Sequence, residues 1–179
     1  MVHKSRSNLF MLSVFVSVTF LGLTVPSSAD SCQPVFDALD KVVTTPSHSY
    51  TTHTASFVNG GKPRESEAIY AQGKVYIRAN GKWMHSPVTP AEILEQQKEN
   101  REHGKATCQF MGNKFVGAEA ALLYSMHNEN EDVREDAQMW ISESTGLPLR
   151  NEEDVDNGGN RVREHRSTRF EYTNIGPPL

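Results

Sequence analysis

The 179-residue sequence lacks the short motifs by which hydrolases and metalloproteins are usually recognised. There is no GxSxG, the strained turn that exposes a nucleophilic serine, and no catalytic triad in a recognisable order. None of the seven histidines is spaced as HxH, HxxxH or HExxH, and His48 and His53 would lie on opposite faces of a strand. We therefore predict that the protein is not an enzyme and has no catalytic residue, no metal site and no cofactor. A metal site assembled from distant histidines is the alternative.

Long apolar runs are also scarce, and the prominent one lies at the N-terminus. It extends from Leu9 to Val25, follows a basic start and precedes the small residues Ser27-Ser28-Ala29. This order is typical of a secretory signal peptide, and the run is short for a bilayer span. We predict that residues 1–29 are a signal peptide and that residues 30–179 are a soluble periplasmic protein with no stable membrane span. A retained anchor is the alternative.

Only two cysteines are present, Cys32 and Cys108. Neither belongs to a CxxC pair or lies beside a histidine, and an exported chain meets an oxidising compartment, so we expect one disulfide. Closing a loop of this length would stabilise the fold by about 4 to 5 kcal/mol before strain is subtracted. A catalytic or metal-binding thiol is the alternative. Acylation of Cys32 is disfavoured because Ala29-Asp30-Ser31 lacks the aliphatic residue of a lipoprotein signal.

Positive charge is in deficit. Two of the 18 basic residues and none of the 22 acidic residues precede Asp30, which leaves 16 basic against 22 acidic and a net charge of −6. A surface of this sign does not favour nucleic acid as a partner. The remaining residues, roughly 150, are enough for one domain with a core of its own.

Two segments have helix signals. In residues 33–45, apolar side chains recur on one stripe. Residues 89–104 begin with Thr89 as a cap and Glu92 three positions later, which is the pattern of a capping box. Only two residues of this second helix are strongly apolar, so we expect it to lie on the surface with most of its circumference in water.

The rest of the chain has strand signals, which are short stretches rich in Val, Ile, Thr, Tyr and Phe between turns such as Asn80-Gly81. The predicted strands cover residues 48–58, 66–72, 74–79, 82–87, 107–110, 120–129, 135–144, 147–155 and 161–175. No helices are spaced as crossovers for a parallel sheet. The sequence therefore predicts an α+β fold in which two helices cover one antiparallel sheet of about 8–9 strands.

Alternation along these strands gives the sheet one apolar face. The side chains that we assign to this face are Tyr70, Val75, Ile77, Leu122, Tyr124, Met126, Met139, Ile141, Phe170 and Tyr172. They form either an ordinary core under the helices or the lining of a ligand cavity that the second helix covers incompletely.

The last two strands are charged on their other face. Glu152, Asp154 and Asp156 would lie opposite Arg161, Arg163 and His165, with the turn at Asn157-Gly158 or at Gly158-Gly159. Cross-strand pairs of this kind contribute about 0.2 to 1 kcal/mol each, so the cluster has a structural explanation and needs no ligand.

Two further segments have two interpretations each. Trp83 lies in GKWMHSPVTPAEIL, which is either the hinge of a lid over the apolar face or a packed corner. We include Trp83 among the candidate ligand contacts. The acidic residues between Glu129 and Asp136 form either a solvated loop or a weak cation site.

The block WISESTGLPLRNEEDVDNGGNRV and the ending FEYTNI resemble the C-terminal part of the LolA/LolB-like superfamily. That superfamily includes periplasmic lipoprotein carriers, RseB and mycobacterial lipid-binding lipoproteins. The N-terminal half matches it in outline, with GKVYIRANGKWM as a strand pair before a covering helix. The resemblance implies a single curved antiparallel sheet, an incomplete β-barrel, that holds acyl chains or another hydrophobic ligand on its concave face.

We therefore expect residues 30–179 to be a single LolA-like domain that binds a lipid or an acylated protein without covalent chemistry. The alternative is a module that recognises an envelope protein partner through its acidic loop and charged face and holds no small ligand.

Overall fold

The computed structural model describes residues 31–55, 61–129, 133–157 and 163–178. The predicted signal peptide, residues 1–29, lies outside these ranges. Within them the chain forms two helices and one nine-stranded antiparallel sheet that is open at both edges. This arrangement confirms the predicted α+β fold with one curved sheet. Neither helix has the length and apolarity that crossing a bilayer would require.

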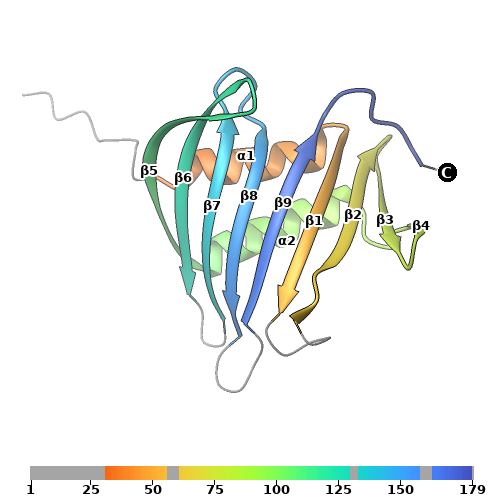
Figure 1. The fold of residues 1–179 in the computed structure, drawn as a ribbon, viewed down its shortest axis with the longest axis horizontal. Helices are drawn as coiled ribbons and strands as arrows, with labels where there is room; N and C mark the ends of the chain where they lie inside the picture. Colours follow the sequence, from red (N-terminus) through yellow and green to blue (C-terminus); the bar gives the residue numbers. More distant parts are fainter. Residues whose placement is uncertain (1–30, 56–60, 130–132, 158–162, 179) are drawn as a thin grey trace, which may run out of the picture.

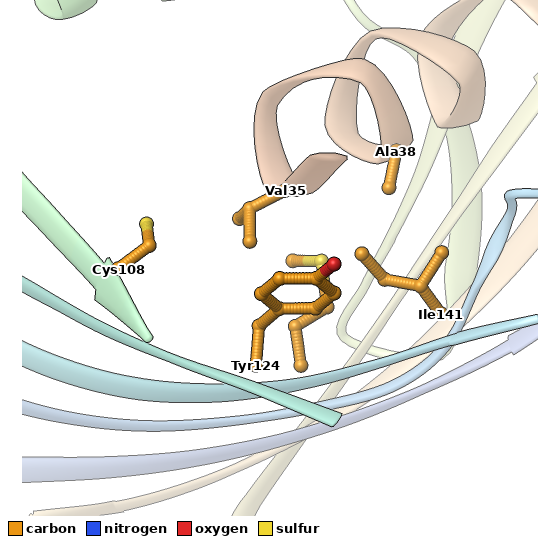
Figure 2. Close-up of a cluster of buried hydrophobic side chains, with 6 residues drawn as sticks. Val35, Ala38, Cys108, Tyr124 and Ile141 are labelled. Atoms are coloured by element: carbon orange, nitrogen blue, oxygen red, sulfur yellow. The ribbon is translucent and has the colours of Figure 1, made fainter. Parts of the chain in front are cut away.

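The sheet is built from two meanders that meet at its centre. Its order is β4-β3-β2-β1-β9-β8-β7-β6-β5, so the first and last strands of the chain are neighbours (Figure 1). The bounds are β1 Ser47–Ala55, β2 Arg64–Ala71, β3 Lys74–Ala79, β4 Lys82–His85, β5 Lys105–Val116, β6 Glu119–Glu129, β7 Arg134–Ser142, β8 Pro148–Asp156 and β9 Arg163–Glu171. Both helices lie on the same side of the sheet, and the strands curve around that side, which we call the concave face (Figures 1 and 2).

Helix α1, Gln33–Thr44, packs tightly on the concave face. Its sequence places a proline in the first turn, and its buried side chains are Val35, Ala38, Val42 and Val43. Two of them, Val35 and Ala38, point toward Tyr124 of β6 and Ile141 of β7 (Figure 2). Burial of this stripe, more than helix propensity, holds α1 in place.

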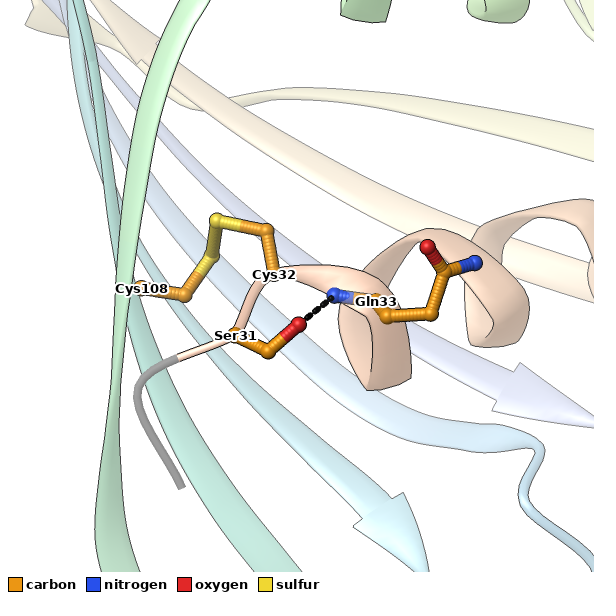
Figure 3. The surroundings of a disulfide bond; sticks show 4 residues. All are labelled: Ser31, Cys32, Gln33 and Cys108. Atoms are coloured by element: carbon orange, nitrogen blue, oxygen red, sulfur yellow. Dashed lines mark hydrogen bonds between the residues drawn. A yellow bond between two sulfur atoms is a disulfide. The ribbon is translucent and has the colours of Figure 1, made fainter. Parts of the chain in front are cut away.

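A disulfide joins the start of α1 to the sheet. Cys32 precedes the helix and is bonded to Cys108 of β5, with the two Cα atoms 5.0 Å apart (Figure 3). Both sulfurs belong to the same apolar cluster as Val35 and Ala38. The pairing that the sequence predicted is therefore present, and neither cysteine is free to act as a nucleophile or ligand.

Helix α2, Pro90–His103, is attached differently. Its N-terminus has the predicted capping box, because Thr89 accepts from the backbone of Glu92 while the Glu92 carboxylate accepts from Thr89. None of its residues is buried. It is held to α1 by the ion pair of Arg101 with Asp40 and by the position of the Arg101 guanidinium over the Phe36 ring, 5.2 Å from its centre.

The hairpin of β3 and β4 corrects the assignment of Trp83. The two-residue turn at Asn80 and Gly81, both at positive φ, pairs Ile77 with Met84 and Arg78 with Trp83. Trp83 therefore points away from Ile77, to the convex face. There it packs against the cluster of Ile69, Ala71 and Tyr76 together with Ile175 of the C-terminal segment. Its place is a packed corner, and the prediction that it faces the ligand side is wrong.

The register of β8 and β9 corrects the predicted turn. Asp156 pairs with Arg163 and Asp154 with His165, which is two residues further along β9 than the nearer of the two predicted turns allows. The connection is therefore longer than two residues. Because the shift is an even number, the charged side chains stay on one face as predicted. Arg161 and the glycines of the turn lie outside the described residues.

Strand β5 is longer than the four residues that its sequence suggested. It runs from Lys105 to Val116 and contains a register shift between Phe110 and Gly112, where the glycine has φ of 103°. This irregularity interrupts the alternation of side chains, so a prediction based on period two ends early.

Candidate ligand-binding face

The concave face contains ten of the eleven residues predicted as ligand contacts. Four of them are core: Val75, Tyr124, Met139 and Ile141 are 3 to 7% exposed. For Tyr124, Met139 and Ile141 the cover is α1. The remaining six are only partly buried: Tyr70, Ile77, Leu122, Met126, Phe170 and Tyr172.

These six side chains lie across several strands and differ in their packing. Leu122 and Met126 border the cluster under α1. The hydroxyl of Tyr172 donates to the Pro148 carbonyl at 2.5 Å, and burial raises the pKa of Tyr172, so it stays a neutral donor. Burial likewise raises the pKa of Tyr70. The partly exposed part of the face is therefore apolar with neutral phenols.

The opposite end of the concave face is polar, which the sequence did not lead us to expect. Strand register puts six polar side chains on it, at the end of the sheet where β7 and β9 begin and β1 and β8 finish. We call them the concave polar cluster: His53, Glu135, Asn151, Glu153, Glu164 and Arg166. Asn151 pairs with Met139 and Glu153 with Ala137, both buried residues of the helix side, which fixes the face.

Arg166 is the arginine of this cluster, and it contacts two of the carboxylates. Arg166 donates to Glu164 at 3.2 Å and has its other terminal nitrogen 3.7 Å from Glu153. Glu164 also accepts from Nδ1 of His53 at 2.7 Å, and Nε2 of His53 is 2.8 Å from the hydroxyl of Ser66. The chain of contacts thus crosses β8, β9, β1 and β2.

The two remaining carboxylates are poorly compensated. Burial raises the pKa of Glu153, and the nearby Glu135 raises it further against the opposing charge of Arg166. Burial also raises the pKa of Glu135, although Arg166 and a hydrogen bond from Asn128 oppose it. At Glu164 burial also acts to raise the pKa. The hydrogen bonds from Arg166 and His53 outweigh it, so the pKa of Glu164 is lowered.

Strand parity alone would have revealed part of this cluster. Phe170 is predicted on the concave face, and Arg166 and Glu164 have the same parity on β9. They are inconspicuous in the sequence because acidic and basic residues alternate on the opposite parity of the last two strands. Glu135 was read as part of a solvated acidic run, yet it points into the concave face, whereas its neighbour Asp136 points outward.

The convex face has its own polar groove of about 800 Å³. Two histidine–carboxylate pairs line it, His127 with Asp136 at 2.7 Å and His165 with Asp154 at 2.9 Å. Hydrogen bonding to Asp154 raises the pKa of His165 despite partial burial. Nowhere in the described parts of the chain do three histidine, cysteine or acidic side chains gather in a geometry that could hold a metal ion.

The acidic segment between β6 and β7 is partly outside the described residues. Of its members that are described, Glu129 contacts Arg134 at 3.4 Å and Asp136 contacts His127. Glu131 and Asp132 lie outside the described ranges. The solvated-loop interpretation agrees with these exposed pairs, and the cation-site alternative finds no ligand set among the described residues.

Neither the protein-family models nor the curated proteins with which the sequence was compared match it. Solved structures similar to the chain include LprF from Mycobacterium bovis, with 10% identity and a TM-score of 0.41 over 84% of this chain and 96% of that one. The Pseudomonas aeruginosa MucA/MucB complex gives 13% identity and a TM-score of 0.39 over 80% of this chain and 58% of the matched chain. Likeness of this size assigns the chain to no family.

Proposed function

We propose that the protein is a periplasmic, non-catalytic binding protein for a hydrophobic or amphipathic ligand, held between the sheet and helix α2. The observation that carries this proposal is that α2 lies on the concave side without burying any residue, while apolar side chains of that face stay partly exposed. A helix that belongs to a finished core buries its apolar stripe. The sequence resemblance to lipid carriers of the LolA/LolB-like kind points the same way.

The attachment of α2 suits a cover that moves. The ion pair and the cation–ring contact that join α2 to α1 are both made by Arg101, which binds Asp40 and lies over Phe36. Burying a ligand's methylene groups would contribute roughly 0.8 kcal/mol each. A chain of eight or more carbons would thus outweigh one partly exposed ion pair.

Two phenylalanines make a matched test. Phe170 is partly buried on the concave face near the centre of the sheet, whereas Phe115 is on the same side by register but lies on the edge strand β5 and is 75% exposed. In Phe170→Asn we expect loss of binding of the neutral fluorescent probe N-phenyl-1-naphthylamine, and in Phe115→Asn we expect unchanged binding. Circular dichroism checks that both variants fold. Equal binding by folded Phe170→Asn and the parent protein would contradict the proposal.

Release of α2 gives a second test. Arg101→Met removes the ion pair with Asp40 and should accelerate probe uptake several-fold in stopped-flow fluorescence, because α2 then opens more often. Lys98→Met is the control, since Lys98 is 61% exposed and its contact is the distant one with Glu95, 3.8 Å away. Identical uptake rates in both variants would show that α2 is not the cover.

The convex groove favours a second function, recognition of a basic envelope protein. Its lining contains Asp136, Glu152 and Asp154 and no lysine or arginine. Binding of this kind weakens as salt screens the charges. A partner captured from envelope extract at low salt and released at 0.5 M salt, by a protein that native mass spectrometry shows to be free of lipid, would favour this function.

A further inference from the structure

We propose, building on the function above, that the ligand is a cationic amphiphile whose protonated amine or guanidinium binds Glu153, Glu135 and the side-chain oxygens of Asn151 and Asn128. The positive group would lie in the concave polar cluster, and the apolar part would extend along the sheet toward Phe170. Three observations support this chemistry.

The first is the surplus of negative charge. Three carboxylates of the cluster face a single guanidinium, and Glu164 takes the closer contact with it, at 3.2 Å. Glu153 is 3.7 Å from the same group although its side chain is only 21% exposed. Glu135 raises the pKa of Glu153, and Arg166 is the charged group that opposes the raised pKa at both carboxylates. A cationic ligand would supply the missing charge.

The second observation is a buried oxygen with no donor. Asn151 is 5% exposed, and its amide nitrogen donates to the Glu153 carboxylate. Because an ionised carboxylate only accepts, this contact turns Oδ1 of Asn151 away from Glu153, and that oxygen meets no donor among the described residues. A nearly fully buried acceptor beside an acidic pair calls for a ligand that donates.

The same pattern recurs at the neighbouring carboxylate. Asn128 donates to Glu135, and its buried Oδ1 also lacks a donor within the described part of the chain. A third buried oxygen without a donor is Oε1 of Gln97 on α2. Against these acceptors, one buried side-chain donor of the described residues is unpaired, Nε of Arg166. The balance favours a group with two or three N–H donors over a carboxylate or phosphate.

The third observation concerns the position of the apolar part. Asn151 pairs with Met139 on one side and Thr168 on the other, and Phe170 follows Thr168 by two residues on the same face. Glu153 itself pairs with Arg166, four residues before Phe170, so the positions of Glu153 and Phe170 are about 13 Å apart along the strands. A ligand that joins them must carry its positive group at the end of an extended chain of about that length, as a long alkylamine does.

Isothermal titration calorimetry with three probes of equal chain length tests the proposal. The protein is expressed with its own N-terminal segment, purified without detergent and titrated at pH 7 with dodecylamine, dodecanol and dodecanoate below their micelle concentrations. We expect dodecylamine to bind at least tenfold more tightly than dodecanol, and dodecanoate to bind most weakly. Glu153→Gln should reduce the preference for the amine over the alcohol at least fivefold.

Asp154→Asn provides the matched control. Asp154 is the next residue on β8, points to the convex face and pairs with His165, so its removal changes the net charge equally without touching the cluster. Equal affinity for amine and alcohol, or tightest binding of dodecanoate, would overturn the cationic ligand and leave the binding function standing. Failure of all three probes to bind would overturn both. If Asp154→Asn lost the preference for the amine to the same extent, the overall charge of the protein would explain the effect. That result would overturn the site.

Discussion

The two ends of the concave face differ in what fills them. Under α1, apolar side chains of β6 and β7 meet Val35 and Ala38, and a disulfide closes the cluster. At the other end the same strands present Asn128 and Glu135, and next to them β8 and β9 contribute Glu153 and Arg166. One end resembles the interior of any domain, whereas the other has buried charge and unpaired oxygens. A protein under selection for stability alone would have little reason to keep the second.

The largest expected loss of stability follows removal of the disulfide, which lies at the α1 end of the concave face. Replacing both Cys32 and Cys108 by serine should lower the free energy of unfolding by about 4 kcal/mol, because the bond closes a loop of 76 residues. Urea denaturation followed by circular dichroism measures this loss. A loss below about 1 kcal/mol would mean that the α1 end does not depend on the bond.

Truncation of an apolar side chain should also distinguish the ends. Met139→Ala, at a site 3% exposed, should lower the free energy of unfolding by about 3 kcal/mol, since it leaves a cavity in packed core. Phe170→Ala is the counterpart at a partly exposed site and should cost less despite its larger side chain. Equal losses in urea denaturation would show that the partly exposed region is packed as tightly as the core.

At the polar end we expect a smaller change in the free energy of unfolding, and there a substitution should increase it. The pKa of Glu153 is raised above the ordinary carboxyl range of about 4, so the folded state holds its proton over a pH range in which the unfolded state has lost it. Stability therefore falls as pH rises through that window. Glu153→Gln should match the parent protein below pH 4 and be more stable at pH 7, in thermal melts across this range. A variant that is less stable than the parent at pH 7 would show that the carboxylate is well compensated.

The smallest expected change in stability concerns Glu67, a carboxylate of the convex face. Its pKa is lowered, so its effect on stability has the opposite sign to that of Glu153. Burial acts to raise the pKa of Glu67, but hydrogen bonds from Arg78 at 2.6 Å and His48 at 3.0 Å outweigh it and lower the pKa. The stabilisation that ionised Glu67 provides is present above the ordinary carboxyl pKa. It is lost as pH falls through the lowered pKa of Glu67 in the folded state. Glu67→Gln should cost about 0.5 kcal/mol at pH 7 and nothing in strong acid. Thermal melts at both pH values measure the difference, and a variant as stable as the parent at pH 7 would contradict it.

Much of the architecture could be predicted because its signals are local. The bounds of α2 follow from the Thr89 capping box, and the β3–β4 hairpin follows from Asn80-Gly81. The same turn contained the information that Trp83 faces away from Ile77, since a two-residue loop determines the pairing of every residue on both sides. The sequence of this hairpin is therefore sufficient to place Trp83 on the convex face. The register of β8 and β9 is different, because two neighbouring glycines allow several turns of similar energy.

The candidate site was less predictable than the fold. The apolar residues of the concave face could be assigned by alternation, but their division into buried core and partly exposed surface depends on where α1 and α2 lie. Met139 and Phe170 have the same sequence signature and different surroundings. The concave polar cluster depends on four strands at once, β1, β7, β8 and β9, and no single pair of residues near in sequence indicates it.

By itself, the sequence determined the class of fold, the identity of most helices and strands, the disulfide and the existence of an apolar sheet face, because turns, caps and alternation act over a few residues and a lone pair of cysteines has one partner choice. Only the tertiary structure decided which part of that face α1 fills, that no residue of α2 is fully buried, and that His53, Glu153 and Arg166 from three strands share one environment. Those facts depend on register and helix placement over distances of many residues. The chemistry that we assign to the site, acceptors and negative charge beside an apolar surface, belongs to this second group.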